Sequence, residues 1–235
     1  DLGGKLFPAP HLRPVDCGNL PFDEGDAAGN RSHIRAAITG ILDRGAVPVL
    51  LGGDDSVPIP MIEALGSGGS SQKFTILQID AHIDWRDVHM GERLGLSSTM
   101  RRASEMAHIE RIIQVGARGI SSVAPEDYED ALAWGVKVVT AYDVACHGVD
   151  PVIDLIPKGS KVIVCIDADA LDPALIPGVI GRAPGGLSYY QCADLIKGAA
   201  RRGRIAAMDF VEFMPEQDVD GIGALTFARL IATSL

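Results

Sequence analysis

The chain has 235 residues, of which 47% are hydrophobic and 22% are charged, and its formal net charge is −10. This composition excludes a disordered chain, and no apolar run reaches the roughly 18–20 residues that a transmembrane helix needs. The acidic charge argues against nucleic acid and an anionic membrane as partners, because both select basic patches. The four cysteines form no C-x-x-C pair, which excludes a zinc knuckle and favours a reducing, cytoplasmic setting.

Short aliphatic runs alternate with amphipathic segments from about residue 30 onward. In chain order, the expected strands are Val47–Leu51, Phe74–Ile79, Arg111–Val115, Val136–Thr140, Lys161–Ile166 and Ile205–Phe210. The expected helices are His33–Asp43, Ile59–Leu65, Thr99–Ala107, Pro125–Trp134, Tyr189–Arg201 and Gly223–Ser234. This alternation predicts an α/β fold with a mainly parallel sheet and helices on both faces. The length favours a single domain over residues 1–235.

Local signals refine some of these boundaries. Ser188 is expected to cap the helix that follows it, and Pro125 suits the first position of its helix. The run Gly66–Ser71 (GSGGSS) is expected to be a flexible connection. It lacks the Lys-Ser/Thr pair that would follow in a phosphate-binding loop.

Four of the expected strands end in polar residues. The runs are Gly52–Ser56 (GGDDS), Asp80–Asp84 (DAHID), Asp167–Pro173 (DADALDP) and Asp209–Glu212 (DFVE). Ligands of open parallel sheets bind beyond the carboxyl ends of the strands, so the runs are expected to share one crevice. Residues i and i+2 of a strand point the same way, which pairs Asp80 with His82 and Asp167 with Asp169.

Carboxylates crowded into one crevice raise one another's pKa unless a cation neutralises them. Carboxylates with one imidazole suit Mn²⁺ or a similar ion better than zinc. Two ions about 3.5–4 Å apart would account for so many ligands and would generate hydroxide near neutral pH. The pattern therefore predicts a site for two divalent ions. A lone acid at a strand end is more often a turn or cap residue, and we interpret Asp54 and Asp172 in that way.

These motifs, together with APGGL, the VE-x-x-P element at Val211–Pro215 and the GER…RR segment around Gly91–Arg102, resemble the ureohydrolase family of arginases, agmatinases and related guanidino-acid amidinohydrolases. The resemblance runs from about Asp26 to the C-terminus, with the family's leading segment shortened or missing. It implies a three-layer α/β/α sandwich and a two-manganese centre. It also implies hydrolysis of a small guanidino substrate to urea and an amine by a metal-bridging hydroxide. Family members are commonly trimers or hexamers, so a homo-oligomer is expected.

Residue by residue, the resemblance implies six metal ligands, which are Asp55, Asp80, His82, Asp84, Asp167 and Asp169. Asp80 and Asp167 match the bridging carboxylates, and Asp84 matches a ligand of the first metal. His82 and Asp169 match ligands of the second metal. Glu212 matches the acid that binds the substrate guanidinium, so Asp84 and Glu212 are the expected catalytic residues.

Three positions depart from the family pattern. Asp55 stands where the family has a His on the first metal, and its extra negative charge is expected to raise the pKa of metal-bound water. Leu96 stands where many members have a His that passes a proton to the leaving amine. His89 and His147 are candidates to replace it, although each is more commonly a surface histidine. Arg182 lies in a loop that lacks the family's acid. It favours a carboxylate tail if it faces the site, and otherwise it is a solvent-exposed loop residue.

The expected activity is therefore an agmatinase-like, metal-dependent amidinohydrolase reaction. Two alternatives stay open. One is hydrolysis of another C–N bond, such as that of a formimino or ureido group, on the same site. The other is a catalytically impaired relative that binds a ligand or partner, which the Asp55 and Leu96 replacements suggest.

Overall fold

The computed structural model describes residues 13–66, 72–119 and 123–234. Its strands form one parallel sheet in the order β1-β6-β5-β2-β3-β4. They are β1 (Val49–Leu51), β2 (Phe74–Ile79), β3 (Ile109–Ala117), β4 (Lys137–Thr140), β5 (Lys161–Asp167) and β6 (Arg204–Val211). The predicted parallel sheet is confirmed, and each predicted strand end lies within two residues of the observed one.

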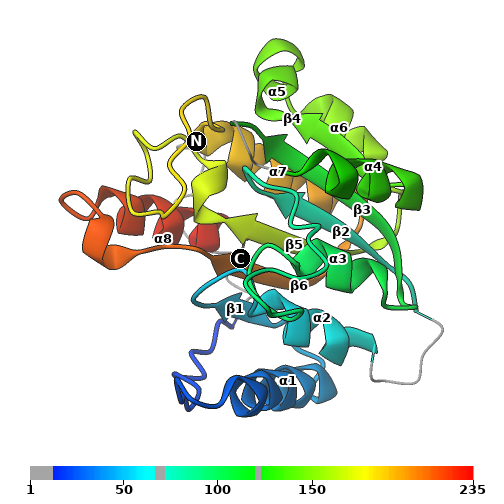
Figure 1. Cartoon of the computed structure of the whole chain (residues 1–235), viewed down its shortest axis with the longest axis vertical. Coiled ribbons are helices and arrows are strands. Elements are labelled where there is room, and N and C mark those ends of the chain that lie inside the picture. Colours follow the sequence, from blue (N-terminus) through cyan, green and yellow to red (C-terminus); the bar gives the residue numbers. More distant parts are fainter. Residues whose placement is uncertain (1–12, 67–71, 120–122, 235) are drawn as a thin grey trace.

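Helices cover both faces of this sheet (Figure 1). They are α1 (Ala27–Asp43), α2 (Pro58–Gly66), α3 (Thr99–Ser104), α4 (Pro125–Trp134), α5 (Ala141–His147), α6 (Asp150–Leu155), α7 (Tyr189–Arg202) and α8 (Ile222–Ser234), with short 3₁₀ turns η1 (Ala168–Ala170) and η2 (Pro215–Gln217). Buried side chains of α1–α4 pack on one face, and those of α5–α8 pack on the other. The predicted three-layer α/β/α sandwich is therefore confirmed. A single domain over residues 1–235 remains a prediction.

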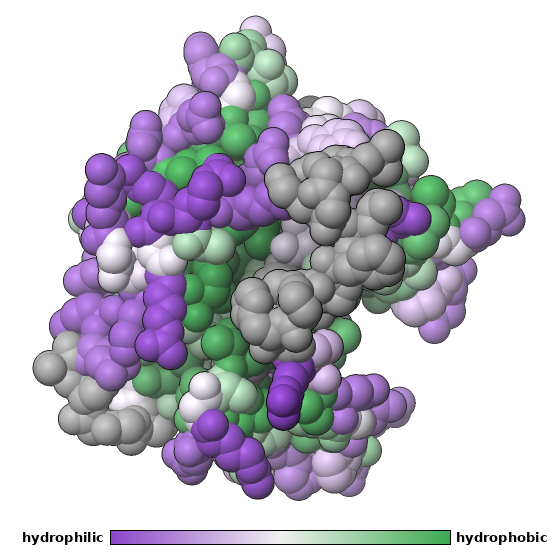
Figure 2. All heavy atoms as spheres, turned by 180° about the vertical axis from the view of Figure 1, so that it is seen from behind, coloured by the Kyte–Doolittle hydropathy of each residue, from purple (hydrophilic) through white to green (hydrophobic). Residues whose placement is uncertain are grey.

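The central strands carry mostly apolar residues because they are buried from both sides. In β2, Ile76 packs toward α1–α4, whereas Leu77 and Ile79 pack toward α5–α8. The back of the molecule shows hydrophobic side chains in a hollow between hydrophilic ones (Figure 2). Among the described helices, none has the length and apolar character needed to cross a bilayer.

Two helices were not predicted, and α1 begins six residues earlier than predicted. Helix α1 starts at Ala27 because the Asp26 side chain accepts a hydrogen bond from Gly29 N–H. Its first turn, AAGN, has no large apolar residue that would have marked it in the sequence. Helices α5 and α6 are only seven and six residues long. Such short helices give little periodicity. The capping box of Thr140 and Asp143 at the start of α5 is the signal that would have found it.

Other local expectations are confirmed or shifted. The side chain of Ser188 accepts from Gln191 N–H in a capping box, and Pro125 opens α4. Helix α3 ends at Ser104, three residues before the predicted end, because β3 already pairs with Phe74 from Ile109. Gly66 ends α2, and the rest of the Gly66–Ser71 run lies outside the described residues.

Gly116 brings the end of β3 against the loop that follows β2. Its φ is +111°, and a Cβ there would lie 2.7 Å from the backbone oxygen of Asp80. Gly135, with a φ of +110°, has nothing within 4 Å of the corresponding position. The two glycines therefore share a backbone conformation but differ in their surroundings.

We expect Gly116→Ala to lower the free energy of unfolding more than Gly135→Ala does. Both variants carry the cost of a side chain at positive φ, about 1–2 kcal/mol. Gly116→Ala adds a backbone clash, which we expect to cost at least about 1 kcal/mol more. Chemical denaturation of the two variants measures the difference. Equal losses would show that β3 does not depend on close approach at Asp80.

Candidate metal centre

The four polar runs converge at one edge of the sheet. They follow β1, β6, β5 and β2, which are consecutive in the sheet order. Successive connections run in one direction across the sheet from β2 to β4 and in the opposite direction from β5 to β6, so the switch point of the topology lies between β5 and β2. Parallel sheets bind ligands at such a switch point. Asp80 and Asp167 lie at the ends of these two strands, and only 1% of Asp80 and 4% of Asp167 is exposed to solvent. The predicted shared crevice is thus present.

One group of candidate ligands consists of Asp80, His82 and Asp169. A ligand atom from each lies within 4.8 Å of the others. His82 Nδ1 lies 3.4 Å from Asp80 Oδ1 and 3.2 Å from Asp169 Oδ2. Backbone N–H groups orient both acids, because His82 N–H donates to Asp80 at 2.7 Å and Ala81 N–H donates to Asp169 at 3.2 Å.

A second group consists of Asp55, Asp80 and Asp84, also within 4.8 Å of one another. Asp80 belongs to both groups, which is the position that a bridging carboxylate must have. All three acids are buried, and Asp55 Oδ2 has no hydrogen-bond partner among the described residues. A buried carboxylate oxygen without a donor is costly unless a cation faces it.

Two glutamines that we did not predict orient this second group. Gln78 donates from Nε2 to Asp80 Oδ2 at 2.7 Å and to Asp84 Oδ2 at 2.6 Å. Gln114 in turn donates to Gln78 Oε1 and to the backbone oxygen of Ile83. The signal was present in the sequence, since each glutamine lies between aliphatic residues of its strand, in ILQI of β2 and in IIQV of β3.

Asp167 and Glu212 border the two groups. Asp167 belongs to neither group, and its Oδ1 accepts from Asp169 N–H at 2.8 Å. Glu212 Oε1 accepts from Asp55 N–H at 2.8 Å, which ties the end of β6 to the loop after β1. Its φ is +61° and that of Asp84 is +47°. Strained non-glycine backbone of this kind occurs preferentially at functional sites.

The electrostatics of the site call for positive charge. Burial, followed by the charge of Asp84, raises the pKa of Asp55 and of Asp80 well above its ordinary value. Burial and the neighbouring Asp169 do the same to the pKa of Asp167. Hydrogen bonds to Asp169 and Asp80 raise the pKa of His82 to about 11, so the position between these two acids favours positive charge.

Asp209 is a further buried acid on β6 that faces this cluster. It is fully buried, and its Oδ2 has no hydrogen-bond partner among the described residues. Burial raises the pKa of Asp209 to about 7, and its charge adds to the shift of Asp55.

The donor set fits two divalent ions of the Mn²⁺ type. Five of the six predicted ligands are carboxylates and the sixth is an imidazole, a set that favours Mn²⁺ over zinc. The unpartnered Asp55 Oδ2 and the shared position of Asp80 fit such a pair. Five carboxylates exceed the charge of two divalent ions by one, and the departure at Asp55 is the source of this excess.

Arg118 holds the loops around the site, although the sequence did not single it out. Its guanidinium donates to backbone oxygens of Asp169, Ala170 and Leu171 on one loop. It also donates to Ala183 O on the next loop and to Gly116 O. Burial lowers its pKa. This one side chain therefore fixes the backbone around a candidate ligand, Asp169.

The acids interpreted as structural do have turn roles. Asp54 accepts from Ser56 N–H at 2.9 Å. Asp172 accepts from the N–H groups of Ala174, Gly185 and Gly186. These three hydrogen bonds lower the pKa of Asp172, and the one from Ala174 N–H has the largest effect.

Arg182 is exposed and is bound away from the two candidate groups. Its Nε donates to Pro177 O at 2.6 Å, and its terminal nitrogen lies 3.2 Å from Gln217 O. It therefore ties two surface loops together. Gly181 beside it lies over the site, because a Cβ there would be 3.4 Å from His82 Cε1.

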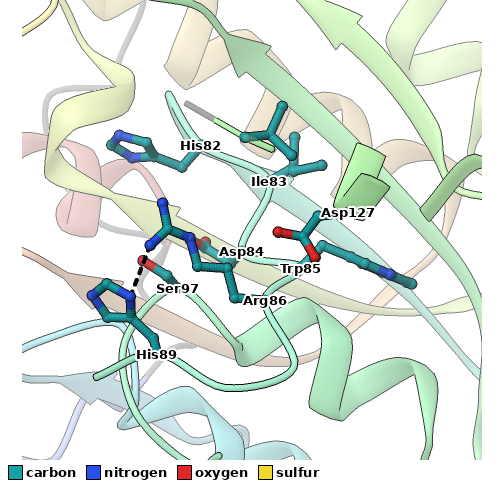
Figure 3. A pocket seen from close by; sticks show the side chains of 9 residues that line it. His82, Ile83, Asp84, Trp85, Arg86, His89, Ser97 and Asp127 are labelled. Carbon is teal, nitrogen blue, oxygen red and sulfur yellow. Dashed lines mark hydrogen bonds between the residues drawn. The ribbon is translucent and has the colours of Figure 1, made fainter. Parts of the chain in front are cut away.

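The two histidines considered for proton transfer lie in different places. His89 lines the same cavity as His82 and Asp84 (Figure 3). His147 is exposed on α5, beside the β4 edge of the sheet, with Nδ1 3.0 Å from Asp143 O. Leu96 is half-buried and supplies no titratable group. Of the two candidates, only His89 is near the predicted site.

A model of the arginase family matches residues 3–235. The chain belongs to the arginase family. It is 30% identical over 240 residues to guanidinobutyrase of Pseudomonas aeruginosa, an alignment that covers 94% of the chain and 74% of that protein. The chain spans 74%, 64% and 66% of the length of the first three curated relatives it matches.

Solved structures of the arginase family share this fold. Formimidoylglutamase of Bacillus subtilis superposes with a TM-score of 0.84 and 25% identity, covering 93% of this chain and 70% of that one. A triple mutant of an arginase-like protein of T. brucei, bound with Mn²⁺, has a TM-score of 0.74 and 26% identity, covering 91% and 69%. These similarities agree with the resemblance found from the motifs.

Asp55 is the candidate ligand that most needs a direct test. If it binds a metal, Asp55→Asn should weaken Mn²⁺ binding at least about tenfold, since even groups that only orient ligands contribute that much. Asp55→His should restore or exceed the original affinity, because it keeps a donor and removes the excess charge. Titration with Mn²⁺ of the metal-free parent protein and of both Asp55 variants measures the three affinities.

Asp54→Asn is the matched control for Asp55. It changes the neighbouring, exposed acid, whose hydrogen bonds go to Ser56. We expect it to leave the Mn²⁺ affinity within about twofold, since charges exposed to water are strongly screened. If all the variants bind Mn²⁺ equally, Asp55 is not a ligand.

Proposed function

We propose that this chain is an agmatinase-like amidinohydrolase that cleaves a small guanidino compound to urea and an amine. The observation that carries the proposal is Asp80, which is shared by two groups of candidate ligands that are buried except for His82. A single shared carboxylate is what a two-metal hydrolase needs. Membership of the arginase family supports the same reaction class.

The proposed metal ligands are Asp55, Asp80, His82, Asp84, Asp167 and Asp169, and Mn²⁺ is the favoured ion. Bound ions would lower the pKa of a water molecule and so supply the nucleophile, hydroxide, for attack on the guanidinium carbon. The Mn²⁺ reported for the T. brucei arginase-like mutant supports this choice of metal. The protein's part is to hold these ligands in a crevice closed by rigid strands.

Glu212 is proposed to bind the guanidinium of the substrate. Its Oε1 is held by Asp55 N–H, and its Oε2 has no hydrogen bond among the described residues. A carboxylate oxygen beside the metal ligands would accept from a guanidinium N–H and fix the carbon for attack. Asp84, held by Gln78, is proposed as the second catalytic residue through its position in the group with Asp55 and Asp80.

A related reaction is the second candidate. The similarity to formimidoylglutamase favours hydrolysis of a formimino group on the same site. Both reactions break a C–N bond at an amidine-like carbon, so the same nucleophile serves either one. We also expect a homo-oligomer, a trimer or a hexamer, in the cytoplasm, and the free state of all four cysteines fits a reducing setting.

The test is product release by the Mn²⁺-loaded protein. We expect urea from at least one of agmatine, arginine, guanidinobutyrate and guanidinopropionate, or formamide from a formimino amino acid. Glu212→Gln should lower kcat/KM by about 100-fold, the scale of a lost charge-assisted contact, while the Mn²⁺ content stays unchanged. Colorimetric urea and formamide assays, with metal analysis of each sample, provide the measurement.

The outcomes separate the candidate functions. Urea supports the guanidino reaction, and formamide supports the formimino reaction. If neither product forms and the chain holds fewer than one metal ion, both hydrolase proposals are wrong. The remaining hypothesis would then be a catalytically impaired protein that binds a ligand or partner.

A further inference from the structure

A cavity of about 140 Å³ opens beside the candidate metal centre (Figure 3). His82 and Asp84 form its inner wall, and Arg86 and His89 are among the residues that line it. The loop that carries Arg86 is fixed by its backbone, since Arg86 N–H donates to Ser97 O at 3.0 Å. A substrate whose reacting carbon lies at the metal ligands has this cavity available for its other end.

The Arg86 guanidinium is free to bind an anion in this cavity. It has no salt bridge within 4.0 Å in the described part of the chain, and its side chain hydrogen-bonds only to His89 Nδ1, at 2.8 Å. The nearest acid in sequence, Asp87, is already held by Arg93 at 2.8 Å and by Arg102 at 2.7 Å. Most of the donors of Arg86 are therefore unused.

Asp127 is the acid on the cavity wall that would most readily compete for Arg86. A close ion pair would lower the pKa of Asp127 below its ordinary value. The pKa of Asp127 is instead raised, because burial and the neighbouring Glu126 outweigh the charge of Arg86. The two side chains share the cavity without forming a salt bridge.

His89 keeps the guanidinium in place. Arginine has no acceptor atom, so His89 Nδ1 is the acceptor in this contact. Figure 3 shows the Arg86 guanidinium between the rings of His82 and His89, on the same side as Asp84. This orientation directs a fixed positive charge toward the space next to the metal ligands.

We propose that Arg86 binds a carboxylate at the far end of the substrate, so that the preferred substrate is a guanidino acid or formimino amino acid and not a guanidino amine such as agmatine. The inference rests on the proposed function and narrows it, from an agmatinase-like reaction on a small guanidino compound to substrates with a carboxylate tail. Arginine binds carboxylates with paired, charge-assisted hydrogen bonds, and it repels a terminal ammonium group. Arg86 thus takes the role of binding the carboxylate tail that the sequence alone suggested for Arg182. The guanidinium of Arg182 is bound to Pro177 and Gln217 instead.

The test compares 4-guanidinobutyrate and agmatine, two substrates with a four-carbon chain on the guanidino group that ends in a carboxylate in the first and in an aminomethyl group in the second. The Mn²⁺-loaded protein should have the higher kcat/KM for guanidinobutyrate. Arg86→Gln should lower the ratio of kcat/KM for guanidinobutyrate to kcat/KM for agmatine by about 10- to 100-fold, chiefly through a higher KM for guanidinobutyrate. Arg86→Glu should reverse the preference, and Arg86→Lys should keep part of it.

Arg182→Gln is the matched control, because it removes an arginine charge from a neighbouring loop. It should leave the ratio within about twofold, since its exposed charge is screened from the cavity. Metal analysis of each variant excludes loss of Mn²⁺ as the cause. If the formimino substrate is the active one, the same comparison uses that substrate and its decarboxylated analogue.

Three results would overturn this inference. They are a preference of the parent protein for agmatine, an unchanged ratio in both Arg86→Gln and Arg86→Glu, and a ratio that moves with Arg182→Gln instead. In each of these cases the proposed hydrolase activity stands. A parent protein that holds two Mn²⁺ and releases no product from any of these substrates would instead overturn the proposed function, and the inference with it.

Discussion

Repulsion among buried carboxylates is the constraint on which the rest of this structure depends. Asp55, Asp80 and Asp84 lie within 4.8 Å of one another, and Asp80 also belongs to a second group with His82 and Asp169. Like charges at this spacing, shielded from water, are stable only if protons or cations neutralise them. The raised pKa of Asp55 and Asp80 and the pKa of about 11 for His82 express this requirement for positive charge.

The fold supplies the rigidity that such a cluster needs. Four neighbouring strands deliver the acids to one edge of the sheet, and three of them, β2, β5 and β6, are buried against both helix layers. The surrounding contacts then hold them there, with Gln78 bridging Asp80 and Asp84 and Arg118 fixing the backbone at Asp169. A well-packed core can sustain the positive φ values of Asp84 and Glu212, which a looser scaffold would relax.

Much of this arrangement follows from the sequence because its signals are local. Runs of buried aliphatic residues predict the strands, and acids at the carboxyl ends of these strands predict the crevice that Asp80 and Asp169 share. Contacts between distant segments leave no such pattern. The bond from Gln114 to Gln78 and the carbonyl contacts of Arg118 depend on strand order, and the open side of Arg86 depends on which arginines already hold Asp87. The short helices α5 and α6 were missed because their caps, not their periodicity, mark them.

The number of Mn²⁺ ions bound per chain tests the central claim most directly. Equilibrium dialysis followed by elemental analysis should give two Mn²⁺ per chain at saturation. Asp80→Asn, which alters the carboxylate common to both groups, should weaken the binding of both Mn²⁺ ions. A variant at the exposed Asp54 should still bind two Mn²⁺ ions per chain. Fewer than one Mn²⁺ per chain in the parent protein at saturating metal would contradict the account.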